Sequence, residues 1–122
     1  MKNKLIITGG ISLILLALFH LSFWHIFNWQ EELSRLSAGN SGIMQLTTVG
    51  FICLFLCLGI ILILCRVEVG NTRLGQSLLL TLSFFFLVRC IAEFIFPGSS
   101  VGLAVLLFLY SLLFLLPALI KK

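Results

Sequence analysis

Hydrophobic residues form four long runs along this chain, at about residues 5–27, 45–65, 75–96 and 101–120. A helix of about 20 such residues rises about 1.5 Å per residue and crosses the roughly 30 Å of hydrocarbon in a membrane. Only short polar connections separate the runs, so successive helices must run in opposite directions. The pattern therefore predicts an all-α fold, a four-helix antiparallel transmembrane bundle made by a single domain over residues 1–122.

The longest connection, residues 28–42, has a helical pattern of its own. Its apolar side chains recur at the spacing of one helical face, at Trp29, Leu33 and Leu36. This pattern predicts a short interfacial helix between the first and second spanning helices. Because glycine tolerates tight turns, we expect Gly39 and Gly42 to turn the chain back into the membrane.

Turn-forming residues mark the other two connections. Gly70 and Asn71 predict a turn within residues 66–73, and Pro97 is expected to end the third helix. Pro117 lies near the end of the fourth run, where we expect it to bend the helix without breaking it.

Small residues on the first two spanning helices would let their backbones approach closely. They are Gly9, Gly10, Ser12 and Ala17 on the first helix, and Gly50 and Gly59 on the second. We interpret the cysteines as small apolar packing residues and not as a disulfide framework. They are Cys53, Cys57, Cys65 and Cys90.

Composition agrees with a membrane protein, since 61% of the residues are hydrophobic and 10% are charged. Soluble proteins average about 45–50% apolar residues and about 25% charged residues. The first run also resembles a secretory signal, but its apolar core is long, and Trp24 and Trp29 suit an aromatic belt at the membrane surface. We expect this run to remain as a spanning helix.

Positive charges lie mostly on one side of the expected membrane. Arg35 stands alone on the other side, against Lys2, Lys4, Arg66, Arg73, Lys121 and Lys122. Short segments rich in Lys and Arg remain cytoplasmic. We therefore expect a multi-pass protein of the cytoplasmic (inner) membrane with both termini cytoplasmic. The net charge of +4 reflects this arrangement and contact with the lipid bilayer, and it does not indicate nucleic-acid binding.

Two charged residues, Arg89 and Glu93, interrupt the third hydrophobic run one helical turn apart. A charge inside a membrane costs roughly 2.5–3.5 kcal/mol, so such a residue marks a candidate functional site. Helix rise puts Arg89 about 21 Å and Glu93 about 27 Å from the inner end, and His20 about 22 Å along the first helix. All three residues are therefore expected in the outer half of the bilayer.

These depths predict an outward-facing ligand-binding pocket built from His20, Arg89 and Glu93, with Trp29 and Gln45 close to it. Simpler roles compete with this prediction. Arg89 and Glu93 can form an ion pair that orders the bundle, or Arg89 can reach the outer headgroups. A lone membrane histidine such as His20 is often a hydrogen-bonded packing residue.

Catalytic and metal chemistry has little support in the sequence. Metal binding would need several converging ligands, and only His20, Glu93 and His25 would share one depth. No Ser or Cys stands at a recognisable catalytic spacing from either histidine. We expect no metal and no cofactor, and His25 suits anchoring at the membrane surface.

Several segments resemble small uncharacterised bacterial membrane proteins with four predicted helices. They are Phe27-Asn28-Trp29 followed by Leu33, Leu36, Asn40 and Ile43-Met44, and Leu74-Gly75 leading to Arg89. The resemblance implies the same four-helix topology and brings no established activity. Such relatives often have a histidine where this chain has Thr47-Thr48, which argues against proton or metal chemistry shared between the first two helices.

The leading functional hypothesis is a non-enzymatic integral membrane protein that binds an anionic amphipathic ligand, such as a lipid headgroup, or a partner membrane protein. The fixed fork of Arg89 suits a carboxylate or phosphate. The alternative is a small proton-coupled transporter, homo-oligomeric because four helices enclose little volume, with Glu93 or His20 as the proton carrier. A third hypothesis is an enzyme that uses His20 as a general base on a lipid-soluble substrate.

Overall fold

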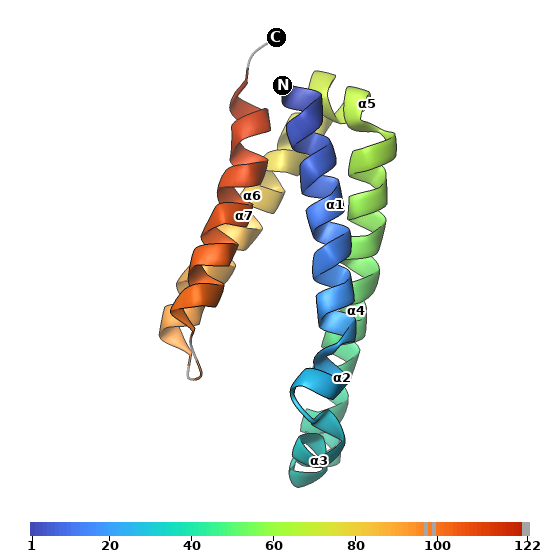
Figure 1. Ribbon diagram of the computed structural model, residues 1–122, viewed down its shortest axis with the longest axis vertical. Helices are drawn as coiled ribbons and strands as arrows, with labels where there is room; N and C mark the ends of the chain where they lie inside the picture. Colours follow the sequence, from blue (N-terminus) through green and yellow to red (C-terminus); the bar gives the residue numbers. More distant parts are fainter. Residues whose placement is uncertain (97, 99, 121–122) are drawn as a thin grey trace. The chain divides into compact units, whose positions relative to one another are not determined.

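The structure, a computed structural model, describes residues 1–96, 98 and 100–120. Four long helices dominate these residues: α1 (Lys2–Leu21), α4 (Ala38–Leu64), α6 (Arg73–Ile95) and α7 (Val101–Leu119) (Figure 1). The described ranges contain no strand. Each long helix has the length and apolar composition needed to cross a membrane. The all-α prediction with four long hydrophobic helices is confirmed.

The first two long helices begin and end at other residues than the sequence predicted. α1 ends at Leu21, because the helix is interrupted at Ser22 before the short helix α2 (Phe23–Ile26) begins. α4 begins at Ala38, well before residue 45. The hydroxyl of Ser37 accepts a hydrogen bond from the Asn40 amide at 3.3 Å and so caps this early start.

The expected turn at Gly39 and Gly42 was wrong, because both glycines lie inside α4. The chain turns at Leu36 instead, which has the extended backbone angles φ −92° and ψ 160°. The capped start at Ser37 lies before both glycines, which continue as helical residues.

A short helix does lie between α1 and α4, as predicted. It consists of α3 (Trp29–Glu32) followed by the 3-10 turn η1 (Leu33–Arg35). Trp29 and Leu33 are both buried, whereas Leu36 is exposed because it follows the last helical turn. Its interfacial position in a membrane stays a prediction.

The expected turn at Gly70 and Asn71 was also wrong. Residues Arg66–Asn71 form the helix α5, and the break comes at Thr72, whose backbone is extended. The Thr72 hydroxyl accepts a hydrogen bond from the Gly75 amide at 3.0 Å, so Thr72 caps the start of α6. The proposed helix stop at Pro97 and the cationic residues Lys121 and Lys122 lie outside the described residues.

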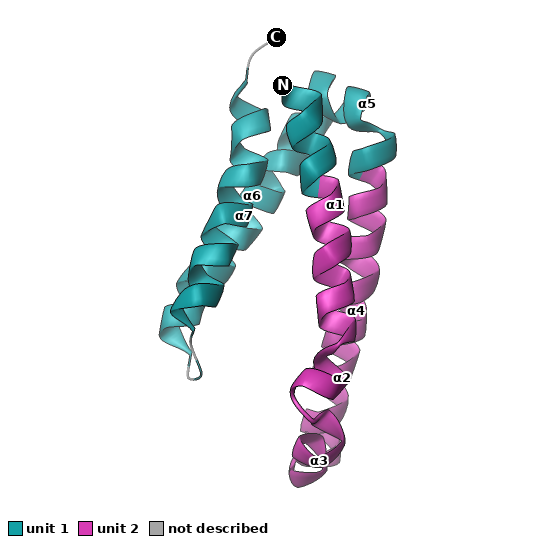
Figure 2. Ribbon diagram, viewed as in Figure 1, with its two compact units in different colours: residues 1–9, 62–122 teal, residues 10–61 magenta. Residues whose placement is uncertain are grey.

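The described chain forms two compact units, which Figure 2 colours teal and magenta. Unit 1 comprises residues 1–9 and 62–122, and unit 2 comprises Gly10–Ile61. α1 and α4 each contribute to both units. A single domain and a four-helix antiparallel bundle stay predictions, and each unit is described by itself.

In unit 1, contacts pair early residues of α6 with late residues of α7. The Gln76 side chain donates to the Ala118 carbonyl at 3.0 Å, and the Cys90 thiol donates to the Ala104 carbonyl at 3.2 Å near the other end. Between them, the fully buried rings of Phe86 and Phe114 stack with centroids 5.7 Å apart. α7 continues through Pro117 without a break, as expected.

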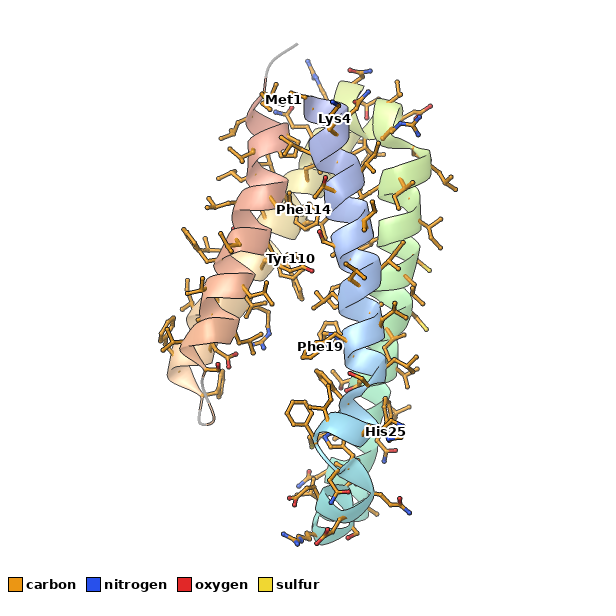
Figure 3. All side chains as sticks on the ribbon, in the orientation of Figure 1. Met1, Lys4, Phe19, His25, Tyr110 and Phe114 are labelled. Carbon is orange, nitrogen blue, oxygen red and sulfur yellow. The ribbon has the colours of Figure 1, made fainter. Side chains whose placement is uncertain are left out.

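Glycines make room for two of the helix contacts. A Cβ atom at Gly9 would lie 2.7 Å from the Phe114 ring, which Figure 3 shows one turn from Tyr110 on α7. In unit 2, a Cβ atom at Gly59 would lie 2.7 Å from the Gly10 carbonyl oxygen. The close approach expected at these glycines is confirmed. The expected close approach was wrong for Gly50, because no atom lies within 4 Å of a Cβ atom added there.

The packing role expected of the cysteines was wrong for three of them. Cys53, Cys57 and Cys65 are exposed, and Cys90 is partly buried against α7. α4 is apolar on all sides, so the sequence pattern did not distinguish its buried face from its exposed face.

A buried serine pair joins α6 to α7, and the sequence analysis did not find it. The Ser83 and Ser111 hydroxyls lie 3.1 Å apart, and Ser111 also donates to the Ser83 carbonyl at 2.9 Å. We expect Ser111→Ala to lower the free energy of unfolding by about 1 kcal/mol, since interhelical hydrogen bonds in membrane proteins contribute about that much. Titration of the detergent-solubilised protein with SDS, followed by circular dichroism, measures the change.

Ser77→Ala is the control for that substitution, because Ser77 is an exposed serine on α6. Equal stability of both variants would show that the serine pair does not hold the two helices together.

Candidate functional site

Arg89 and Glu93 form the ion pair that their spacing suggested. Both lie on α6, and Nη2 of Arg89 is 3.3 Å from Oε2 of Glu93. The Glu93 side chain is only 11% exposed, whereas the Arg89 side chain is 43% exposed. The carboxylate is therefore the enclosed partner, and the guanidinium keeps an open side.

Glu93 has a second contact that ties α6 to α7. Its Oε1 atom accepts a hydrogen bond from the backbone amide of Ser100 at 3.4 Å. Ser100 is the cap of α7, and its own hydroxyl accepts a bond from the Leu103 amide at 3.4 Å. A carboxylate is stabilised at such a helix start, where the amides carry partial positive charge. Glu93 is thus fixed from two directions.

The open side of Arg89 lies near the end of α6. Arg89 lies six positions before Ile95, the last residue of the helix. The Cα atoms of these two residues are therefore about 9 Å apart along the helix axis. A long arginine side chain spans most of such a distance by extending along the helix. The guanidinium can therefore extend toward the end of α6 that leads into α7.

His20 makes the contacts of a packing residue. Its Nδ1 atom lies 2.8 Å from the Leu16 carbonyl oxygen of its own helix. Its ring lies 4.7 Å from the Phe23 ring and 5.4 Å from the Phe55 ring, centroid to centroid. These contacts in unit 2 favour the structural interpretation of His20.

The residues predicted for one pocket divide between the units. Arg89 and Glu93 belong to unit 1, and His20, Trp29 and Gln45 belong to unit 2. A shared pocket of His20, Arg89 and Glu93 stays a prediction.

Trp29 and Gln45 do come together, in a cleft of unit 2 with a volume of about 560 Å³. Trp24, His25 and Ser41 also line it, and His25 is labelled in Figure 3. The sequence predicted only surface anchoring for Trp24 and His25, and the cleft depends on how the chain folds between α1 and α4.

The walls of this cleft are held firmly. Trp29 is buried, and its ring lies 5.1 Å from the Trp24 ring in an edge-on arrangement. The Gln45 amide donates to the Ser41 hydroxyl at 3.2 Å. Asn28 between α2 and α3 has a left-handed backbone with φ 46°, which asparagine tolerates better than most residues. The cleft offers neutral hydrogen-bonding groups beside two indoles.

Metal-binding clusters are absent from the part of the chain that the structure describes, where no three His, Cys, Asp or Glu side chains gather.

Exposed ion pairs join Arg35 to Glu31 at 2.6 Å and to Glu32 at 3.5 Å. Such exposed pairs contribute little to stability, typically about 0.3–0.5 kcal/mol.

Comparison of the chain with known protein families, with curated proteins and with solved structures finds no match. The resemblance to small four-helix bacterial membrane proteins stays a prediction.

Proposed function

We propose that this chain is a non-enzymatic integral protein of the cytoplasmic membrane, with both termini cytoplasmic, and that it binds an anionic amphipathic ligand through Arg89. A lipid headgroup has the required chemistry. The observation that carries the proposal is the half-open guanidinium of Arg89, which the enclosed carboxylate of Glu93 holds at 3.3 Å.

The proposal follows from the number of donors on a guanidinium. Arginine has five N–H donors in a rigid fork that fits a phosphate or carboxylate in a bidentate manner. Glu93 engages Nη2 and compensates the charge on the apolar helix, while the exposed part of the side chain remains accessible. A ligand anion would complete the set of partners. A polar group of a partner membrane protein is the competing occupant.

Substitution of Arg89 tests the proposal. We expect Arg89→Ala to reduce co-purified anionic lipid by about tenfold, the loss that accompanies about 1.4 kcal/mol of binding free energy. Arg89→Lys should restore binding only in part, because an ammonium lacks the planar fork. Native mass spectrometry after gentle detergent extraction measures the retained lipid and any retained protein partner together.

Arg35→Ala is the matched control, because it also removes one arginine that pairs with a glutamate four residues away. The Arg35 side chain is more exposed than that of Arg89, at 63%, and its replacement by alanine should leave lipid retention unchanged. Unchanged lipids and partners in Arg89→Ala would refute the proposal.

Proton-coupled transport remains the alternative function, and the contacts of Glu93 argue against adopting it. A proton carrier needs a carboxylate oxygen that a proton can reach. The Arg89 guanidinium and the Ser100 amide already engage Oε2 and Oε1 of Glu93.

A further inference from the structure

A second polar cavity lies in unit 1, at the opposite end of α6 from Arg89. Its volume is about 370 Å³. It is lined by the start of α1, the corner between α5 and α6, and the end of α7. Lys2 and Arg73 contribute two cationic side chains, and Asn71 and Gln76 contribute two amides. None of its lining residues is acidic within the described ranges.

Hydrogen bonds hold two of these side chains in place. The Lys2 ammonium donates to the Ile120 carbonyl at 3.1 Å, and the Gln76 amide donates to the Ala118 carbonyl at 3.0 Å. Carbonyls at the end of a helix lack intrahelical partners and carry partial negative charge. Lys2 and Gln76 thus cover the negative end of α7. An ammonium has three donors, so Lys2 keeps two of them after this bond.

Arg73 stands across the cavity as the first residue of α6. No carboxylate lies within ion-pair distance of Arg73 in the described part of the chain. The first amides of α6 add partial positive charge on this side. A cavity with two cations, two amides and no described carboxylate has the chemistry of an anion site.

We propose that this cavity binds a phosphate group. The Arg73 fork takes two phosphate oxygens, the Lys2 ammonium takes a third, and Asn71 supplies a neutral donor. The sequence assigned Lys2 and Arg73 only to membrane topology, and the cavity gives them a binding role. This inference does not use Arg89, so the two proposals can fail independently.

Binding of three compounds to the full-length protein in detergent tests the proposal and identifies the source of the phosphate. The compounds are phosphatidic acid, diacylglycerol with the same acyl chains, and inorganic phosphate. We expect native mass spectrometry to show phosphatidic acid bound and diacylglycerol not bound. Inorganic phosphate that displaces phosphatidic acid would assign the cavity to the phosphate group itself, and failure to displace it would assign the cavity to a lipid headgroup.

The variant Lys2→Gln with Arg73→Gln should weaken binding of phosphatidic acid by about 25-fold, since each lost hydrogen bond to the phosphate contributes about fivefold. Lys4→Gln with Arg66→Gln removes the same charge from unit 1 but from residues that do not line the cavity. That control should bind as the wild type does.

Lys2→Arg keeps the charge and the bond to Ile120, and it should retain binding. Equal losses in the two double variants would overturn the proposal, because they would show attraction to total charge without a site. Equal binding of phosphatidic acid and diacylglycerol would overturn it as well.

Discussion

Replacing Gly75 with alanine should lower the free energy of unfolding by about 3 kcal/mol, at the upper end of overpacking effects. A Cβ atom at this position would overlap the backbone of Val69 in α5. Backbone atoms cannot move aside as a flexible side chain can, so the corner between α5 and α6 would have to open. That opening would also strain the bond from the Gly75 amide to the Thr72 hydroxyl. SDS titration followed by circular dichroism measures the loss.

Gly50→Ala is the matched control for Gly75→Ala. Gly50 lies inside α4 with nothing within 4 Å of the added atom. Alanine favours a helix over glycine by about 1 kcal/mol, so this variant should be at least as stable as the wild type. Wild-type stability in Gly75→Ala would contradict the close corner between α5 and α6.

Replacing Glu93 with leucine should cost about 2 kcal/mol, because it leaves the Arg89 charge without its partner on an apolar helix. The cost stays below that of a fully buried charge because Arg89 is half exposed and can extend toward the headgroups. It also removes the acceptor for the Ser100 amide. The same SDS titration measures the change.

The double variant Arg89→Leu with Glu93→Leu should recover most of that stability, because it removes both charges. A double-mutant cycle gives the coupling free energy between them. Under the proposed function, the double variant folds and yet fails to retain anionic lipid. Glu31→Leu is the control, since Glu31 pairs with Arg35 at the same spacing but is 59% exposed. Additive effects of the two leucines would show that Arg89 and Glu93 do not depend on each other.

The four long helices were predictable because hydrophobic runs of spanning length leave few other structures available. Their ends were not. Ser37 and Thr72 each cap a helix start through one hydroxyl, which accepts a bond from the amide three residues later. A sequence pattern shows a candidate cap but not whether the backbone comes within reach of it.

The candidate site was likewise predictable only in part. The Arg89–Glu93 pair was predictable because a spacing of four residues places two side chains on one helical face. The contact from Glu93 to Ser100 depends on how the chain passes from α6 to α7, and the Ser83–Ser111 pair depends on which helix faces meet. Neither geometry can be predicted from the sequence of one helix taken alone.

The length of α4 has a consequence for the membrane around it. Its 27 residues span about 40 Å, which exceeds a hydrocarbon layer of roughly 30 Å. The excess length lies in the first turns, which are polar at Asn40 and Ser41, and it is accommodated by tilting the helix or by letting that end project into the headgroups. Projection of the first turns would carry Ser41 and Gln45 to the surface, and a thicker bilayer would submerge them. Bilayer thickness would thus set whether water reaches the cleft beside Trp29.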